Sequence, residues 1–164
     1  MSTRPITLEE LAALLPPKAR LIGVDLGDKT VGLALSDVER RIASPLLTIA
    51  RGKFATDAAA LASAIAKHQV AALIFGKPLN LDGGEGPRVQ STRAFMRNFA
   101  LLIPVPTAFW DERFSTAAVL RSLIANDVSR SKRAAVVDKM AAAYILQGAL
   151  DRLGAIAAER QTNS

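Results

Sequence analysis

The chain has 164 residues, 50% of them apolar and only 22% charged, with a formal charge of +6. This length and composition suit one compact domain with a single core and exclude general disorder. The absence of cysteine excludes disulfides, thiolate metal sites and cysteine nucleophiles. The positive balance favours a polyanionic partner such as nucleic acid, with a purely solubilising charge as the alternative.

The opening segment of the chain has one short apolar patch and no signal-peptide core, and no later segment reaches membrane-spanning length. We therefore expect a cytoplasmic protein with no membrane partner. Within this segment, Thr7–Leu15 is expected to form a short helix with Thr7 as its N-cap, ended by Pro16 and Pro17. Residues 1–20 are accordingly predicted to be an N-terminal extension outside the core.

Three short strands are expected next. Leu21–Leu26 and Val31–Ser36 are apolar runs separated by Gly27-Asp28-Lys29-Thr30, which predicts a β-hairpin. Ile42–Ala50 predicts a third strand. Together they indicate an antiparallel meander.

The hydrophobic pattern then alternates between helical and extended periods. Ser115 and Ser131 can cap the last two helices. In chain order, the expected elements are a helix at 56–67, a strand at 70–75, a helix at 90–102, a strand at 105–110, a helix at 116–125 and a long helix from 131 to about 153. We expect one domain at 21–154 and a frayed tail at 155–164.

These elements predict an α/β fold with a five-stranded mixed sheet. Three antiparallel strands are followed by parallel additions, and helices flank the sheet.

Three carboxylates occupy unusual positions in this pattern. Asp25 ends an otherwise apolar strand, Glu112 follows the last strand, and Asp138 borders the buried face of an alanine-rich helix. Burying three acids is tolerable mainly if a divalent cation gathers them. Taken singly, each has a structural explanation, as a turn cap, a surface pair or a helix-edge acid. The set of three points to phosphodiester chemistry.

Polar and basic residues near these acids are candidate contacts to a phosphate backbone. Glycines between Gly76 and Arg88 would allow close backbone approach, although a mobile surface loop is the alternative. The single histidine, His68, falls at a helix C-terminus and gives no sign of zinc or histidine chemistry. The predicted substrate-binding residues are Lys29, Lys77, Asn80, Arg88, Arg113, Ser115 and Thr116.

An acid followed by a glycine turn between two strands also occurs in actin-like ATPases and sugar kinases. Those folds need two such lobes, and this chain is long enough for one. Nucleotide hydrolysis is therefore a minor alternative.

Four ordered blocks give the chain a resemblance to a known family. Residues 23–37, 76–90, 111–116 and 137–146 resemble the bacterial YqgF-type family of pre-16S ribosomal RNA nucleases, which is related to Holliday junction resolvases. The resemblance spans residues 20–153. It implies a ribonuclease H-like fold with Asp25, Glu112 and Asp138 as the catalytic acids.

The resemblance also implies a mechanism and partners. The three acids would bind Mg²⁺ or Mn²⁺, with two ions about 3.5–4 Å apart supporting in-line hydrolysis of a phosphodiester. The favoured substrate is precursor ribosomal RNA at the 5′ end of its 16S species, with ribosomal particles as further partners and a monomer or homodimer as the acting form. The alternatives are a resolvase that cuts branched DNA and a non-catalytic nucleic-acid-binding factor in ribosome assembly or transcription.

Overall fold

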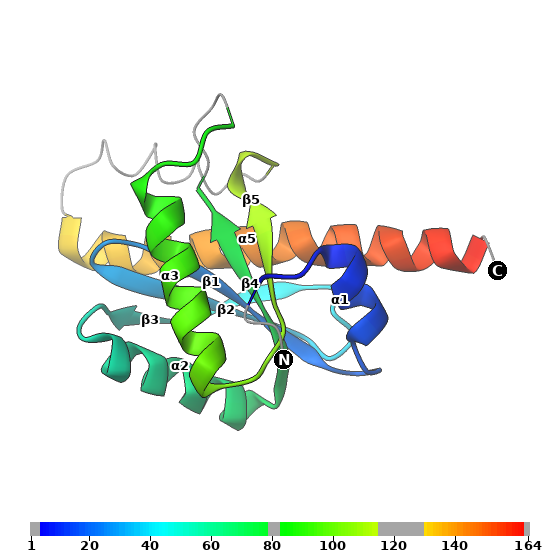
Figure 1. Cartoon of the computed structure of the whole chain (residues 1–164), viewed down its shortest axis with the longest axis horizontal. Coiled ribbons are helices and arrows are strands. Elements are labelled where there is room, and N and C mark those ends of the chain that lie inside the picture. The colour runs from blue at the N-terminus through cyan, green and yellow to red at the C-terminus, as the bar shows by residue number, and fades with distance from the viewer. Residues whose placement is uncertain (1–3, 79–82, 115–129, 163–164) are drawn as a thin grey trace.

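A five-stranded mixed sheet forms the centre of the molecule, and the computed structural model describes residues 4–78, 83–114 and 130–162 (Figure 1). The sheet order is β3-β2-β1-β4-β5. β2 pairs antiparallel with both β1 and β3, whereas β4 pairs parallel with both β1 and β5. The predicted mixed sheet is therefore confirmed. The strands are β1 (Arg20–Leu26), β2 (Thr30–Ser36), β3 (Ala43–Ala50), β4 (Val70–Lys77) and β5 (Thr107–Asp111).

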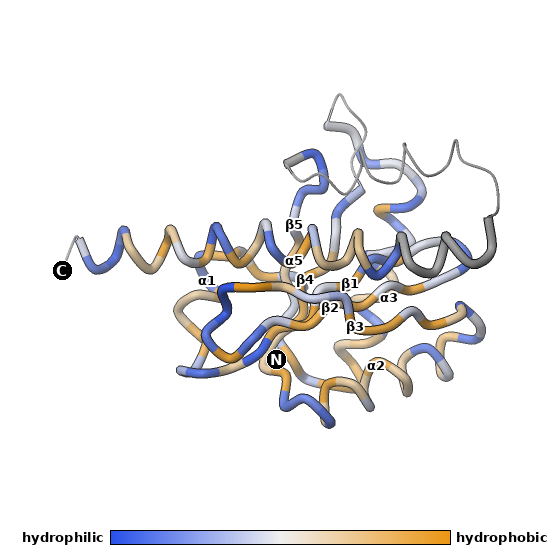
Figure 2. Tube along the Cα trace, turned by 180° about the vertical axis from the view of Figure 1, so that it is seen from behind, coloured by the Kyte–Doolittle hydropathy of each residue, from blue (hydrophilic) through white to orange (hydrophobic). Residues whose placement is uncertain are grey.

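Helices cover both faces of this sheet. α2 (Phe54–His68) and α3 (Pro87–Leu102) lie on the front in Figure 1, and α5 (Arg130–Thr162) crosses the opposite face, as the view from behind shows (Figure 2). The remaining described helices are α1 (Leu8–Leu14) and the 3₁₀ turn η1 (Glu112–Phe114). The expected helix at 116–125 lies outside the described residues.

A hydrophobic core lies on each face of the sheet, and successive side chains along a strand point to opposite faces. In β1, Ile22 and Val24 pack with α2 and α3, whereas Leu21 packs with α5. Residues of β1 with odd numbers therefore point toward α5. This parity fixes the face on which Asp25 lies.

The segment before β1 is part of the core, so its prediction as a separate extension is wrong. Helix α1 begins after Thr7, which accepts from the amide of Glu10 in a complete capping box, as expected for this N-cap. Leu8 and Leu11, three residues apart on one helical face, are buried in the core that contains α5. Ile6 also donates to Thr107 of β5 over 2.8 Å. The apolar face of α1 needed a partner, and α5 and β5 provide it.

The predicted frayed tail after residue 154 is also wrong, because α5 runs without interruption to Thr162. Alanine, glutamate and arginine in this stretch favour a helix, and a single glycine does not end it. Ile156 is buried in the core, and Arg160 donates to the carbonyl of Glu9 in α1. The described helices, α5 included, lack the sustained apolar length that would cross a bilayer.

Alanine substitutions at two glycines of α5 test whether this helix is continuous and packed against β5. A methyl group added at Gly154 would meet nothing within 4 Å, so Gly154→Ala should raise the free energy of unfolding by about 0.5–1 kcal/mol through helix propensity. A methyl group at Gly148 would lie 2.6 Å from the Trp110 ring, so Gly148→Ala should lower it by about 1–3 kcal/mol. Urea unfolding of both variants measures the contrast. A loss of stability in Gly154→Ala would contradict a continuous helix.

Candidate active site

Asp25 lies near the carboxyl end of the central strand β1 and is only 2% exposed. It shares the α5 face of the sheet with Gly23, where an added methyl group would lie 2.7 Å from Leu146 of α5. Across the hairpin, Asp25 pairs with Gly32 of β2. The first predicted acid is therefore buried under α5, at the end of the sheet where the β1–β2 turn lies.

Glu112 begins η1 directly after β5 and is 4% exposed. Its Oε1 would lie 2.8 Å from a methyl group placed on Gly76 of β4, and Ile145 of α5 would lie within 2.5 Å of the same group. Gly76 follows Phe75, which pairs with Val24, so the next position along the parallel register sets Gly76 beside Asp25. Glu112 thus extends over β4 toward β1, on the face covered by α5.

Asp138 approaches from α5 itself and is half-buried. Its backbone carbonyl lies directly against Gly32, and its side-chain Oδ2 accepts a hydrogen bond from Thr30 at the start of β2. Since Gly32 pairs with Asp25, the third acid lies over the strand beside the first. The three carboxylates come from β1, η1 and α5 and share one face and one end of the sheet.

Sequence reasoning did not connect Gly32 with the three acids, and it connected Gly76 only with the approach of a phosphate. Ala141 and Ala142 of the alanine-rich helix α5 are fully buried, and their small side chains let the helix approach the sheet. The strands contribute equally, because a side chain at Gly32 would overlap the backbone of Asp138. The glycine between two apolar residues of β2 was the available signal. Thr30, which holds Asp138, gave no signal in the sequence.

The chemistry of the three donors suits a hard divalent cation, which takes carboxylate oxygens as ligands. Within residues 4–78, 83–114 and 130–162, however, no group of three or more acidic, histidine or cysteine side chains is arranged to hold a metal ion. Arg88 supplies a positive charge beside Asp25, with its Nη2 3.9 Å from Oδ1. The catalytic and metal-binding roles of these acids therefore stay a prediction.

Arg88 and Lys29 lie at the same end of the sheet as the acids. Arg88, near the start of α3, donates to the carbonyl of Leu26 at 3.4 Å and so reaches over the end of β1. Lys29 is exposed in the turn between β1 and β2. Their roles as substrate contacts stay a prediction.

Lys77, another predicted substrate contact, already has an acidic partner. Lys77 Nζ lies 3.0 Å from Glu85, and it also sits over the ring of Phe109. Arg93 shares both of these partners. Hydrogen bonds from Arg93 and Lys77 hold the pKa of Glu85 below its usual range. Sequence reasoning missed Glu85 and Arg93, whose pairing depends on how α3 sits beside β5.

Arg113, expected to hold a phosphate with two hydrogen bonds, makes such bonds to Asp111. Its Nη2 lies 2.7 Å from Oδ2, and its Nε lies 3.1 Å from each oxygen. Burial raises the pKa of Asp111, but the hydrogen bonds from Arg113 outweigh burial and hold that pKa below its usual value. Gly83, with a left-handed φ of 88°, passes close to the Arg113 guanidinium. The predicted contacts Asn80, Ser115 and Thr116 lie outside the described residues.

Comparison with known proteins identifies the family. Residues 19–152 match the model of the RuvX family, described as Holliday junction resolvase. The chain belongs to the RuvX family. This membership confirms the resemblance inferred from the four sequence blocks.

Curated relatives in the RuvX family match almost the whole chain. A protein of Methylocella silvestris named "Putative pre-16S rRNA nuclease" is 60% identical over 159 residues, which cover 97% of this chain and 99% of the relative. A protein of Beijerinckia indica with the same name is 61% identical over 153 residues, or 93% of each chain.

Solved structures show that this RuvX chain has the ribonuclease H-like fold expected from the sequence. RuvC of Thermus thermophilus aligns with a TM-score of 0.53 at 15% identity, covering 83% of this chain and 97% of RuvC. The yeast mitochondrial Holliday junction resolvase Ydc2 aligns with a TM-score of 0.50 at 14% identity, covering 94% and 88%. Identities this low establish the fold alone.

Because α5 lies directly against Gly32, any side chain at position 32 should lower the free energy of unfolding. Gly32→Ala should lower the free energy of unfolding by about 1–3 kcal/mol, because backbone atoms of Asp138 and Lys139 cannot move aside without shifting the helix. Gly52→Ala is the matched control, since a methyl group there meets nothing within 4 Å, and it should change stability by no more than about 0.5 kcal/mol. Chemical denaturation measures both. Equal effects would mean that α5 is not seated on Gly32.

Proposed function

We propose that this RuvX-family chain is a metal-dependent endonuclease that acts in the cytoplasm on structured nucleic acid. Its proposed substrate is precursor 16S ribosomal RNA, cleaved at the 5′ end. The proposal is supported by the elements that carry Asp25, Glu112 and Asp138, which lie on one face and at one end of the sheet, and by the burial of two of these carboxylates. The names of relatives about 60% identical over nearly the full length support the choice of substrate.

The three acids would hold Mg²⁺ or Mn²⁺ in this proposal. Buried carboxylates such as Asp25 and Glu112 need positive charge nearby, because desolvation penalises an unpaired anion. Bound divalent ions would supply an activated water and stabilise the charge that develops on the phosphate oxygens. No side chain then has to serve as the nucleophile.

Other side chains of the site would orient these groups and the substrate. Thr30 fixes the carboxylate of Asp138 by donating to Oδ2. Arg88 extends across the end of β1 beside Asp25, where its remaining donors can hold a phosphate oxygen. With Lys29 in the adjacent turn, it would position the backbone without reading base sequence.

Resolution of branched DNA is the second candidate. The family model carries the description Holliday junction resolvase, and one RuvC structure with a TM-score of 0.51 was solved with a Holliday junction. A homodimer would suit such a two-fold substrate, whereas a monomer with ribosomal particles as partners would suit RNA maturation. A non-catalytic binding factor is the third candidate.

Replacing Asp25 tests the proposed chemistry. Asp25→Asn should reduce Mg²⁺-dependent cleavage of precursor 16S RNA at least about a hundredfold, because losing an ion ligand removes several kcal/mol of transition-state stabilisation. Asp28→Asn removes the same charge from the exposed turn three residues later and should retain activity. Cleavage is followed on gels at fixed salt, and circular dichroism confirms that both variants are folded.

The same assay separates the candidate functions. Faster cleavage of a four-way DNA junction than of precursor RNA at matched salt would support the resolvase. RNA binding without cleavage, unchanged by Asp25→Asn, would support the binding factor. Tight ATP binding in a calorimeter would point instead to nucleotide hydrolysis.

Replacing Glu85 tests how the glycine-rich connection between β4 and α3 contributes to substrate affinity. Glu85→Gln should strengthen RNA binding about two- to fivefold at low salt, because Lys77 and Arg93 lose the carboxylate that neutralises them. The slope of log Kobs against log salt should steepen by up to about 0.9, equivalent to one further phosphate contact. Filter binding across a salt series measures both quantities.

Glu39→Gln is the control, since it changes the same charge in the exposed turn between β2 and β3, at the opposite end of the sheet. An equal gain in both variants would mean that only net charge matters and that Lys77 and Arg93 do not face the substrate.

A further inference from the structure

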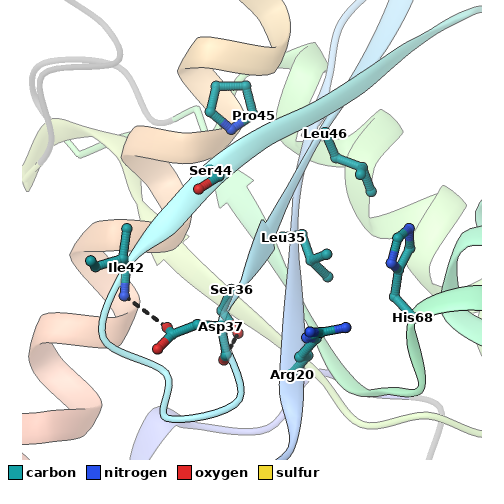
Figure 3. Close-up of a pocket in the computed structure, with 9 residues that line it drawn as sticks. All are labelled: Arg20, Leu35, Ser36, Asp37, Ile42, Ser44, Pro45, Leu46 and His68. Atoms are coloured by element: carbon teal, nitrogen blue, oxygen red, sulfur yellow. Dashed lines mark hydrogen bonds between the residues drawn. The ribbon is translucent and has the colours of Figure 1, made fainter.

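A cavity of about 420 Å³ opens at the amino end of β1, far from the three acids (Figure 3). Arg20 at the start of β1 lines it, and Asp25 lies five residues further along, or about 16 Å at 3.3 Å per residue. Alternation places Arg20 on the α2 face, whereas Asp25 lies on the α5 face. The cavity is therefore separated from the candidate active site by both the length and the thickness of the sheet.

Arg20 lines this cavity and has no charge partner among the residues that the structure describes. Its Nε is shielded from solvent and has no acceptor, and no residue in the described part of the chain accepts a hydrogen bond from its guanidinium or forms an ion pair with it. A buried donor without an acceptor destabilises the fold, and more so when it is charged. Arginine is the side chain best suited to hold an oxyanion with two parallel hydrogen bonds.

The acidic residue that lines the cavity does not neutralise Arg20. Asp37 Oδ1 accepts from the amides of Ile42 at 3.0 Å and Arg41 at 2.8 Å, and these bonds hold the pKa of Asp37 below its usual range. In Figure 3, Asp37 and Ile42 lie on one side of the strands and Arg20 on the other. The charge of Asp37 thus stabilises the β2–β3 turn, and the charge of Arg20 is available to a ligand in the cavity.

His68, the last residue of α2, supplies a second donor from a different element. Figure 3 places its imidazole on the same side of the strands as Arg20, Leu35 and Leu46, which all line the cavity. An imidazole N–H offers one hydrogen bond, in addition to the two that the arginine fork can make. Three donors match the three terminal oxygens of a phosphomonoester better than the two of a carboxylate.

The size and the remaining walls define the rest of the ligand. Small-molecule sites span about 300–1,000 Å³, so this cavity holds more than a phosphate group alone. The two leucines provide an apolar surface for an organic body. We propose that the cavity binds a small organic phosphate of mononucleotide size, with its phosphate on Arg20 and His68 and its body against Leu35 and Leu46.

Titration of the full-length ¹⁵N-labelled chain with adenosine 5′-monophosphate, followed by NMR, tests this site. The expected result is that shifts concentrate at the amides of Arg20, Leu35, Leu46 and His68. Adenosine, which lacks the phosphate, and inorganic phosphate, which lacks the organic body, should each bind at least about tenfold more weakly. Equal binding of adenosine, equal binding of inorganic phosphate, shifts centred on Asp25, or no shift with any probe would overturn the proposal.

Variants assign the effect to the cavity. Arg20→Gln and, as a second variant less exposed to folding problems, His68→Gln should each weaken binding of the nucleotide, about tenfold or more for Arg20→Gln. Lys67→Gln, an exposed basic residue next to His68 that does not line the cavity, should leave binding unchanged. Unchanged binding in folded Arg20→Gln or His68→Gln, or equal weakening in Lys67→Gln, would overturn the site.

A phosphomonoester can belong to a free nucleotide or to the end of an RNA strand. A 5′-phosphorylated RNA tetramer compared with its 5′-hydroxyl form distinguishes these sources. Stronger binding of the phosphorylated tetramer than of the mononucleotide would support the proposal with an RNA end as the source, and the reverse would support it with a free nucleotide. Equal binding of the two tetramers, with no binding of the mononucleotide, would contradict it.

Discussion

The close seating of α5 on the glycines of the sheet is the contact on which the rest of the structure depends. At Gly32 the backbone of Asp138 occupies the space a side chain would need, and at Gly23 the same is true of Ala142 and Leu146. Because helix and strands touch through backbone, the depth of α5 is fixed by hard atoms and not by flexible side chains. That depth sets Asp138 over the strand next to Asp25.

Charged side chains form pairs at the end of the sheet where the three candidate acids lie. Lys77 and Arg93 share Glu85, and Arg113 is held by Asp111. These cations are therefore pre-positioned by carboxylates, and a phosphate backbone would have to replace those carboxylates to bind them. Exposed pairs of this kind contribute little to stability, so the exchange would cost little. The net charge of the whole chain describes this surface poorly, because it does not report which cations are already paired.

β1 carries polar groups of opposite sign at its two ends and on its two faces. Arg20 begins the strand on the α2 side, and Asp25 nearly ends it on the α5 side. The interval of five residues is odd, so alternation alone sends the two side chains through opposite faces. The residues between them are buried and apolar, and they keep the two ends apart within one rigid element.

Local pattern determined much of this protein. The sequence by itself predicted the hairpin, the five strands and the Thr7 cap, because periodicity, capping and turn chemistry act over a few neighbouring residues. Only the tertiary structure decided that α1 packs into the core, that Arg160 of α5 donates to Glu9, and that Thr30 donates to Asp138. Those outcomes depend on which surfaces meet across long chain separations, and short-range patterns carry no information about that choice.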